Sequence, residues 1–412
     1  MTHSQGLVGK VVSRVWDRAL TRPGKGLILV GIAAGSFGSV SLGIPVYALF
    51  CVLFMIGATA LVANTAHRPR LRVDGGLPAK AVAGQTVHGQ VSVTNEGRFA
   101  AYDVAVEFER LPRALRLLRD NTSAPCLAPG ETLALPVAVA PLRRGLYKLP
   151  RIHGYTSFPF NMIKNSRCRR EPGTLLVQPF FHPLEGIDVP VRPRYQPGGI
   201  ALTSRVGESP EYIGNREYRP GDSVRHMDHR AWARLTKPAV REYQEEYYCR
   251  LALVLDTYVP GVRPQPRSGY PAFEAAVSLA ASVADALANG EYIIDIFAAG
   301  PELYVFRAGR HTAHLENVME ILACVEACRS NPFEVVTPAL YDELQQMSTV
   351  IAVLLDWDED RKNLIRAAQE AGCQVKVLVV HDGPTTEPVE FVDCAATQLS
   401  PSRIHEGGLG VV

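Results

Sequence analysis

The chain has 412 residues, of which 47% are hydrophobic and 20% are charged, and its formal net charge is +2. This length is typical of two or three domains, and this composition is typical of a chain that buries full hydrophobic cores. A net charge so close to zero provides no overall basic field, so we expect no nucleic-acid partner.

The eight cysteines are scattered, and only Cys324 and Cys328 lie close together, on one expected helix. This spacing is not that of a metal-binding knuckle, and we expect no disulfide framework. The cysteines are instead interpreted as small buried apolar side chains, which fits a reducing compartment.

An uncharged segment of 41 residues extends from Gly26 to Ala66. One crossing of a bilayer needs about 20 apolar residues, so the segment predicts two transmembrane passes. The first is expected from Leu27 to about Val40 and the second from about Val46 to Val62, with a turn at Ser41 to Pro45. The small residues of the first pass suit close packing against the second.

Positive side chains flank this segment on both sides: Lys10, Arg14, Arg18, Arg22 and Lys25 precede it, and Arg68, Arg70 and Arg72 follow it. The positive-inside rule then places both chain ends in the cytoplasm. Residues 1–67 are therefore expected to form a cytoplasmic N-terminal segment and a two-pass anchor in a bacterial inner membrane. A cleaved signal peptide is the alternative, but 25 residues precede the apolar run and no cleavage site stands out.

Residues 68–188 are expected to form a small antiparallel β-sandwich. Apolar residues alternate with polar ones in three runs, around Val91, Val106 and Val137, and turn residues separate the runs. A period of two indicates strands with one buried face. No set of residues in this region suggests catalysis.

From residue 250 to 412 short buried strands alternate with helices, beginning with a strand at Leu251 to Leu255. The expected order continues with helix 273–288, strands 292–298 and 303–306, helix 314–328, strand 350–355, helix 361–371 and strand 375–380. Such alternation predicts a doubly wound, mostly parallel α/β sheet. Ligands of these sheets bind beyond the carboxyl ends of the strands. That position holds Asp256, Thr257 and Tyr258 after one strand, and Asp356, Trp357 and Asp358 after another.

Residues 189–249 are expected to connect the two domains, first through a stretch rich in proline, glycine and arginine and then through a dense motif. The motif resembles the signature of the domain of unknown function 58 family, whose members share a tyrosine, a Pro-Gly-Asp, an Arg-x-Ile-Asp-Trp-Arg and an Ala-Arg in that order. The matching residues here are Tyr218, Pro220, Gly221, Asp222, Arg225, Asp228, Arg230 and Arg234, followed by Arg241. The stretches 143–147 and 157–161 look like two further elements of the family.

This resemblance implies a fold similar to a von Willebrand factor A domain and a setting beside MoxR-type AAA+ ATPases, often with a membrane-bound transglutaminase-like protein. Domains of this type often bind a divalent ion through Asp-x-Ser-x-Ser after the first strand. Here both serine positions are lost, to Tyr258 and Pro260. Magnesium needs several oxygen ligands in near-octahedral geometry, so we expect no metal. The alternative is a magnesium site at Asp256, Thr257 and Asp356.

The motif itself admits other interpretations. His226, Asp228 and His229 invite a metal, but a short helix capped by Asp222 would turn the two imidazoles to different sides. The charged residues of the motif either dock a partner through arginine–carboxylate pairs or form an ion-pair network that fixes one domain to the other.

The sequence carries no G-x-S-x-G, no G-x-x-x-x-G-K-[ST], no H-E-x-x-H and no G-x-G-x-x-G after a strand, so we expect no enzyme. The favoured function is a membrane-anchored interaction or assembly factor with a docking face for an AAA+ ATPase or its client. In it, Tyr258 and Trp357 would form an aromatic pair inside an acidic rim, unless Trp357 folds into the core. A metal-dependent adhesion-type binder is the second hypothesis. A hydrolase that uses Asp256 with Asp356 is the third.

Overall fold

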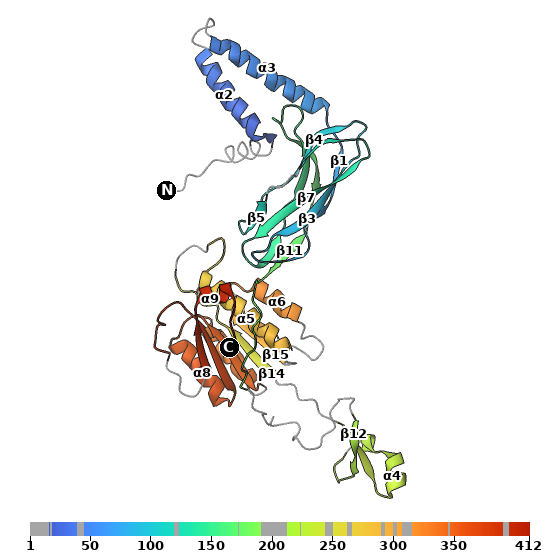
Figure 1. Ribbon diagram of the computed structural model, residues 1–412, viewed down its shortest axis with the longest axis vertical. Coiled ribbons are helices and arrows are strands. Elements are labelled where there is room, and N and C mark those ends of the chain that lie inside the picture. Colours follow the sequence, from blue (N-terminus) through green and yellow to red (C-terminus); the bar gives the residue numbers. More distant parts are fainter. Residues whose placement is uncertain are drawn as a thin grey trace. The chain divides into compact units, whose positions relative to one another are not determined.

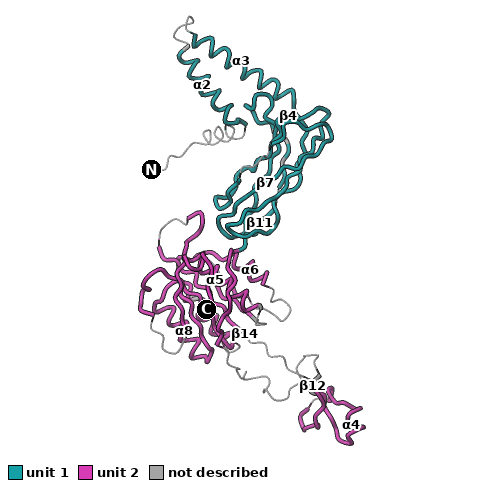
Figure 2. Tube along the Cα trace, in the orientation of Figure 1, with its two compact units in different colours: residues 1–178 teal, residues 179–412 magenta. Residues whose placement is uncertain are grey.

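The computed structural model divides into two compact units, residues 1–178 and 179–412 (Figure 2). The sequence placed the end of the sandwich domain at residue 188. The structure describes residues 16, 19–38, 45–118, 123–171, 173–190, 212–222, 224–243, 250–261, 266–289, 293–299, 303–306, 315–344, 347–389 and 395–412.

The first unit begins with two apolar helices, α2 (Arg22–Gly38) and α3 (Pro45–Ala66), drawn in blue in Figure 1. They pack in opposite directions, because Leu27 lies against Gly57 and Gly35 lies against the ring of Phe50. At 1.5 Å per residue α2 is about 26 Å long and α3 about 33 Å, against about 30 Å for a bilayer core. The expected turn at 41–44 lies outside the described residues.

Among the described residues two helices are long and apolar enough to cross a membrane, α3 and α5 (Pro271–Asn289). They differ in burial, because 6% of the apolar window of α3 is buried but 67% of that of α5. The apolar surface of α5 is therefore buried inside its own domain, and α3 is the candidate membrane-spanning helix.

The β-sandwich follows α3 and consists mainly of two four-stranded antiparallel sheets, in the orders β1-β3-β7-β5 and β10-β9-β4-β6, with a three-stranded sheet β2-β11-β8 beside them. Its strands are β1 (Leu71–Gly76), β2 (Lys80–Val82), β3 (Val87–Asn95), β4 (Ala101–Phe108), β5 (Leu115–Leu118), β6 (Ser123–Leu127), β7 (Thr132–Pro141), β8 (Gly145–Lys148), β9 (Ile152–Thr156), β10 (Asn165–Arg170) and β11 (Thr174–Gln178). Val91, Val106 and Val137 are buried in its core, as the period of two predicts.

The sandwich is joined to α3 by hydrogen bonds of the buried residue Asn64. The Asn64 side chain, 4% exposed, donates to the carbonyls of Phe158 and Ile163, and the backbone carbonyl of Asn64 accepts from the Asn165 side chain. A buried asparagine that satisfies its donors in this way fixes the end of the helix on the sandwich.

The second unit contains a six-stranded sheet in the order β16-β15-β14-β17-β18-β19, parallel except for β16. Its strands are β14 (Arg250–Leu255), β15 (Ile293–Ala299), β16 (Leu303–Phe306), β17 (Thr349–Leu354), β18 (Gln374–Val380) and β19 (Ala395–Leu399). Its helices are α5, α6 (Leu315–Cys324), α7 (Phe333–Leu344), α8 (Glu359–Glu370) and α9 (Pro401–Glu406). The strand order reverses between β14 and β17, which defines a switch point.

Helices cover both faces of this sheet, and alternate residues of β14 enter the two cores. Leu251 and Leu253 pack with α5, α6 and α9, while Ala252 and Val254 pack with α7 and α8. A strand buried on both faces carries an unbroken apolar run, which is the pattern of Leu251 to Leu255. We refer to residues 250–412 as the sheet domain.

Two helical expectations need correction. The helix expected from 314 to 328 ends at Cys324, and Cys328 instead pairs with Tyr258 in an isolated β-bridge. A second helix, α7, then precedes β17, although Pro338 lies inside it. Its hydrophobic residues, which include Val336 and Leu340, are buried against the sheet. This packing stabilises the helix despite the destabilising effect of the internal proline.

The segment before the sheet domain lies against it. Lys376 of β18 is buried and donates to the carbonyl of Asp188, at 2.8 Å from nitrogen to oxygen, and the Thr349 hydroxyl donates to the carbonyl of Pro190. This packing accounts for the division between the units at Gln178, before the expected boundary.

Between this segment and β14 lies a small separate element, which we call the arginine module (residues 212–243). Strands β12 (Tyr212–Glu217) and β13 (Ala239–Tyr243) pair in antiparallel fashion around the 3-10 turn Val224–His226 and helix α4 (His229–Leu235). Much of the proline- and glycine-rich connection, residues 191–211, lies outside the described residues.

Candidate functional site

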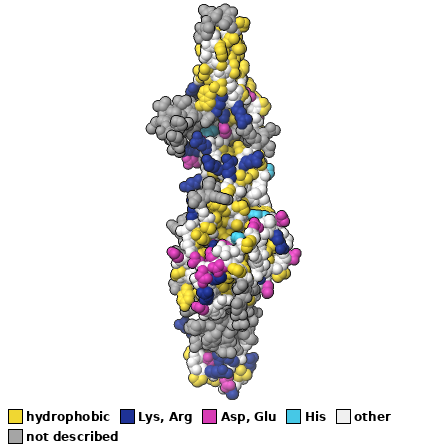
Figure 3. Space-filling view, turned by 90° about the vertical axis from the view of Figure 1, so that its left-hand side faces the viewer, with side chains coloured by type: hydrophobic (Ala, Val, Ile, Leu, Met, Phe, Trp, Pro, Cys, Tyr) yellow, Lys and Arg dark blue, Asp and Glu magenta, His cyan; other side chains and the backbone are white. Residues whose placement is uncertain are grey.

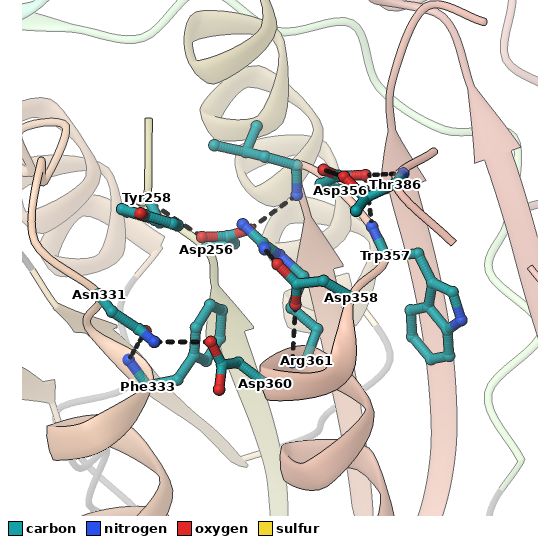
Figure 4. A network of polar contacts seen from close by, with 11 residues as sticks. Asp256, Tyr258, Asn331, Phe333, Asp356, Trp357, Asp358, Asp360, Arg361 and Thr386 are labelled. Carbon is teal, nitrogen blue, oxygen red and sulfur yellow. Dashed lines mark hydrogen bonds and ion pairs between the residues drawn. The ribbon is translucent and has the colours of Figure 1, made fainter. Parts of the chain in front are cut away.

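The carboxyl ends of β14 and β17 meet at the switch point, where the structure brings together the acids that the sequence places there (Figure 4). Asp256 follows β14 and Asp356 follows β17. The backbone N–H of Leu355 donates to Asp256 Oδ2 at 2.9 Å, so the two loops are in direct contact.

The carboxylate of Asp256 is the centre of this site and is 1% exposed. Its Oδ1 accepts from the backbone N–H of Tyr258 at 2.8 Å. Its Oδ2 accepts from Leu355 and from two nitrogens of Arg361, Nε at 2.8 Å and Nη2 at 2.7 Å. A buried charge needs such pairing, and Asp256 has both an ion-pair partner and backbone donors.

The Arg361 side chain is 2% exposed and provides the positive charge of the site. Its Nη1 donates to Asp358 Oδ2. The guanidinium carbon lies 5.7 Å from the ring centre of Tyr258 and 5.1 Å from that of Phe333, within the range of cation–π contacts. One guanidinium is therefore held by two carboxylates and two aromatic rings.

The local sequence of α8 explains why the arginine is there. Asp358 is the N-cap of the helix, and its side chain accepts from the backbone N–H of Arg361. The same aspartate thus caps the helix and binds the side chain of the residue three positions later. Arg361 lies in the first turn of α8, directly below the carboxyl ends of the strands.

Asp356 is held by the loop that follows β18. Its Oδ1 accepts from the backbone N–H groups of Trp357 and Thr386, each at 2.8 Å, and its Oδ2 accepts from the Thr386 hydroxyl. Burial acts to raise the pKa of Asp356, but the hydrogen bonds from Thr386 outweigh it and hold the pKa below its ordinary value.

The buried pair has opposing electrostatic contributions. Burial raises the pKa of Asp256, and the charge of Arg361 and the two backbone donors act against this rise. Burial also acts to lower the pKa of Arg361, but Asp256 and then Asp358 outweigh it and raise the pKa. The charge of Arg361 and the backbone donors therefore favour the charged form of Asp256 against its burial, whereas the guanidinium itself stays protonated in any case.

The two aromatic residues lie in different environments. Trp357 is 4% exposed and belongs to the core formed with α7 and α8, which corrects the expectation that it stands at the surface beside Tyr258. Its backbone N–H donates a hydrogen bond to the Asp356 side chain, and the indole points away from the acids (Figure 4). Tyr258 is half-buried, and its ring contacts Arg361.

The residues at the switch point do not fit a divalent ion. Magnesium needs several oxygen ligands, but both oxygens of Asp256 are engaged by N–H donors and the guanidinium lies where a cation would bind. Pro260 offers no side-chain ligand. Among the residues that the structure describes, no group of three or more histidines, cysteines or acids is placed to hold a metal ion.

The arginine module holds most of the signature residues in a second network of ion pairs. Arg216 forms a bidentate ion pair with Asp222, with nitrogen–oxygen distances of 2.7 and 2.8 Å, and the backbone N–H of Arg219 donates to the same carboxylate. The arginine fork and this backbone bond lower the pKa of Asp222 to about 2.

Asp228, and not Asp222, is the N-cap of the helix in this module. Its Oδ1 accepts from the backbone N–H groups of Arg230 and Ala231, and its Oδ2 accepts from Arg241 at 3.2 Å. The Ala231 bond is the first of several contacts that lower the pKa of Asp228 to about 2. Asp222 instead closes the turn from Arg219, because its own N–H donates to the Arg219 carbonyl.

The other signature residues surround these pairs. The backbone N–H of Tyr218 donates to Pro238, Pro220 and Gly221 form the turn, and Gly221 has a φ of +109°, a conformation that favours glycine. Among the described residues of the module, the exposed Lys and Arg residues are Arg219, Arg225, Arg230, Arg234, Lys237 and Arg241.

Sequence reasoning missed Arg361, Thr386 and Phe333, which complete the switch-point site. Arg361 was assigned only to a helix. The signal available was the spacing Asp358-x-x-Arg361, since an acid that caps a helix lies next to the residue three positions on. The other two lie at a distance in the sequence, Phe333 at the start of α7 and Thr386 in the loop after β18.

The comparisons with solved structures give low similarity. The CARDB domain of the PF1109 protein from Pyrococcus furiosus is 19% identical, with 27% of this chain and 90% of that chain covered and a TM-score of 0.19. Escherichia coli alpha-2-macroglobulin is 20% identical, with 29% and 8% covered and a TM-score of 0.19. The SrpA adhesin of Streptococcus sanguinis is 13% identical, with 29% and 65% covered and a TM-score of 0.18.

No curated protein matches this chain. Residues 214–383, which cover nearly all of the arginine module and the sheet domain as far as the loop after β18, match the family described as Protein of unknown function DUF58, and this match supports the resemblance to that family.

Proposed function

We propose that the chain is a membrane-anchored interaction or assembly factor without catalytic activity. Its sheet domain binds a protein partner through the face at the carboxyl ends of β14 and β17. The partner class that the family resemblance implies is a MoxR-type AAA+ ATPase or its client. The anchor is the pair of helices α2 and α3, with both chain ends in the cytoplasm.

The observation that carries this proposal is the internal cation at the switch point. Asp256 is saturated by Arg361 and two backbone donors, and it is too deeply buried to reach a substrate. A general acid or base must come within about 3 Å of the group with which it exchanges a proton. The arrangement therefore supports a rigid binding face better than a hydrolase or an ion site.

The chemical character of this face comes from the start of α8. Glu359 and Asp360 are exposed there, and Asp358 is partly exposed. Tyr258 adds a half-buried aromatic ring at the same edge. Such an acidic rim favours a partner with a basic surface, because complementary charges speed encounter and exclude partners of like charge.

The test is the binding of a purified MoxR-type ATPase to the full chain in nanodiscs, measured by biolayer interferometry. Glu359→Lys reverses a charge of the rim without touching the buried network, and we expect it to weaken binding at least about fivefold. Glu370→Lys makes the same change at the far end of α8 and is the matched control. We expect binding to persist in a chelator.

Two results would contradict the proposal. Equal binding by the Glu359 and Glu370 variants would place the interface elsewhere. Loss of binding in the chelator, restored by magnesium, would support the metal-dependent alternative at Asp256, Thr257 and Asp356.

A further inference from the structure

The helices α2 and α3 form an apolar groove with a cavity volume of about 740 Å³. We propose that this groove binds one acyl chain of an anionic phospholipid. The inference rests on the proposed membrane anchor and adds a ligand site to it.

The shape of the groove follows from the glycines of α2. Gly35 is packed against the ring of Phe50, with an added Cβ only 3.0 Å from a ring atom, so the helices touch there. A Cβ added to Gly31 would meet nothing within 4 Å, although Gly31 lines the cavity. The helices therefore leave open space beside Gly31 that no side chain of either helix fills.

The mouth of the groove, at the start of α2 and the end of α3, is held by the sandwich. Met162 and Ile163 line the cavity, and the Gly24 Cα lies so close to the Met162 carbonyl that an added Cβ would be 2.2 Å from its oxygen. Asn64 binds the carbonyl of Ile163 from the other helix. Both helices are thus fixed at this end by contacts with the sandwich.

The length of the groove favours an acyl chain over a transmembrane helix. Along α2 its lining extends from Gly24 to Ser36, which is about 18 Å at 1.5 Å per residue. One leaflet of a bilayer has a hydrocarbon depth of about 15 Å, half of about 30 Å, and a single acyl chain occupies this depth. A partner helix would need a groove through the full thickness.

The charge at the mouth favours an anionic headgroup. Arg22 is exposed and lies two residues from Leu20 and from Gly24, which both line the cavity. Arg68 and Arg70 are exposed just beyond α3, which returns to the same end. Lys and Arg side chains gather next to the apolar helices on the face seen in Figure 3. Because lipid tails are as apolar as the groove, the headgroup supplies the preference.

The experiment uses the full chain in phosphatidylcholine vesicles that contain phosphatidylglycerol with a photoactivatable diazirine in its acyl chain. Labelled positions are mapped by mass spectrometry. We expect the label to concentrate on groove residues such as Gly31 and Gly57 and to be sparse on outward-facing residues such as Ala33. Gly31→Trp fills the groove and should reduce groove labelling at least fivefold.

The matched control is Ala33→Trp, which adds the same side chain two residues away on an exposed part of α2 and should leave groove labelling unchanged. Arg22→Gln should lower labelling by the phosphatidylglycerol probe about fivefold, or about 1 kcal/mol. A phosphatidylcholine that carries the same diazirine should label the wild type and Arg22→Gln equally.

Uniform labelling around both helices, or equal effects of the two tryptophans, would overturn the site while leaving the membrane anchor intact. Labelling of neither helix would refute the anchor itself, and the lipid site with it.

Discussion

The ion pair between Arg361 and Asp256 offers a sharp test of the switch-point site. Arg361→Met keeps the length of the side chain but removes the guanidinium. Asp256 then retains only the backbone donors of Leu355 and Tyr258. It becomes a buried charge without a counter-charge at a position that is 1% exposed.

Removing one partner of a buried ion pair costs about 3–5 kcal/mol, because the remaining charge is left uncompensated. For a unit of this size, residues 179–412, each kcal/mol corresponds to about 2–4 °C in Tm. We therefore expect Arg361→Met to lower the Tm by about 6–20 °C at pH 7. The double variant Asp256→Asn with Arg361→Met should lose less than the sum of the single changes, because no charge is buried.

Circular dichroism of the full chain in detergent, followed with temperature and with urea, measures this loss. The control is Arg366→Met in the same helix, where the arginine is exposed and lies 3.6 Å from Glu359. An exposed pair of this kind contributes less than about 1 kcal/mol. Equal melting temperatures for the two methionine variants would refute the central role of Arg361.

Three further predictions concern the two aromatic residues of the switch point, the Asp222 carboxylate and the topology of the anchor. Trp357→Ala should cost about 3–5 kcal/mol, read as a lower Tm, whereas Tyr258→Ala should change it much less, because Trp357 is in the core and Tyr258 is half-buried; a double variant that melts like the wild type would show that we have misplaced the indole. Asp222 has a folded pKa of about 2, below about 3.9 in an unfolded chain, so its contribution is present above pH 4 and is lost as the pH falls through about 2. Pepsin cleavage within the arginine module, normalised to an unstructured peptide, should therefore rise between pH 4 and pH 2, whereas in Asp222→Asn it should be high already at pH 5; identical profiles would argue against the Arg216–Asp222 pair. A cytoplasm-active reporter fused after Val412 should be active, and activity only of an exported reporter would exclude two passes with both ends inside.

Periodicity predicted the regular parts of the fold. The alternation around Val91 and Val137 marks sandwich strands, and the apolar run from Leu251 to Leu255 marks a strand buried on both faces. These patterns are local: one buried face of a strand produces the alternation, and two buried faces produce the unbroken apolar run. The sequence does not predict helix α7, because Pro338 interrupts its pattern and the packing of the helix against the sheet, which stabilises it, is not a local feature.

The site was predicted in position but not in content. Topology alone brings Asp256 to Asp356, since the carboxyl ends of neighbouring parallel strands meet. The cation that neutralises Asp256 comes from a helix 105 residues later, and no local pattern links the two. The same limit applies to Trp357, where a surface indole and a core indole have the same sequence context and only the packing of α7 and α8 decides.

The measurement that tests this account most directly is isothermal titration of the full chain in detergent with magnesium and with manganese. Arg361 occupies the position of a cation between Asp256 and Asp358, so we predict no saturable binding by the wild type. Asp256→Ala, which removes the principal acid of the site, should give the same flat titration. A micromolar affinity in the wild type that is lost in Asp256→Ala would contradict the account, because it would mean that a metal displaces the guanidinium.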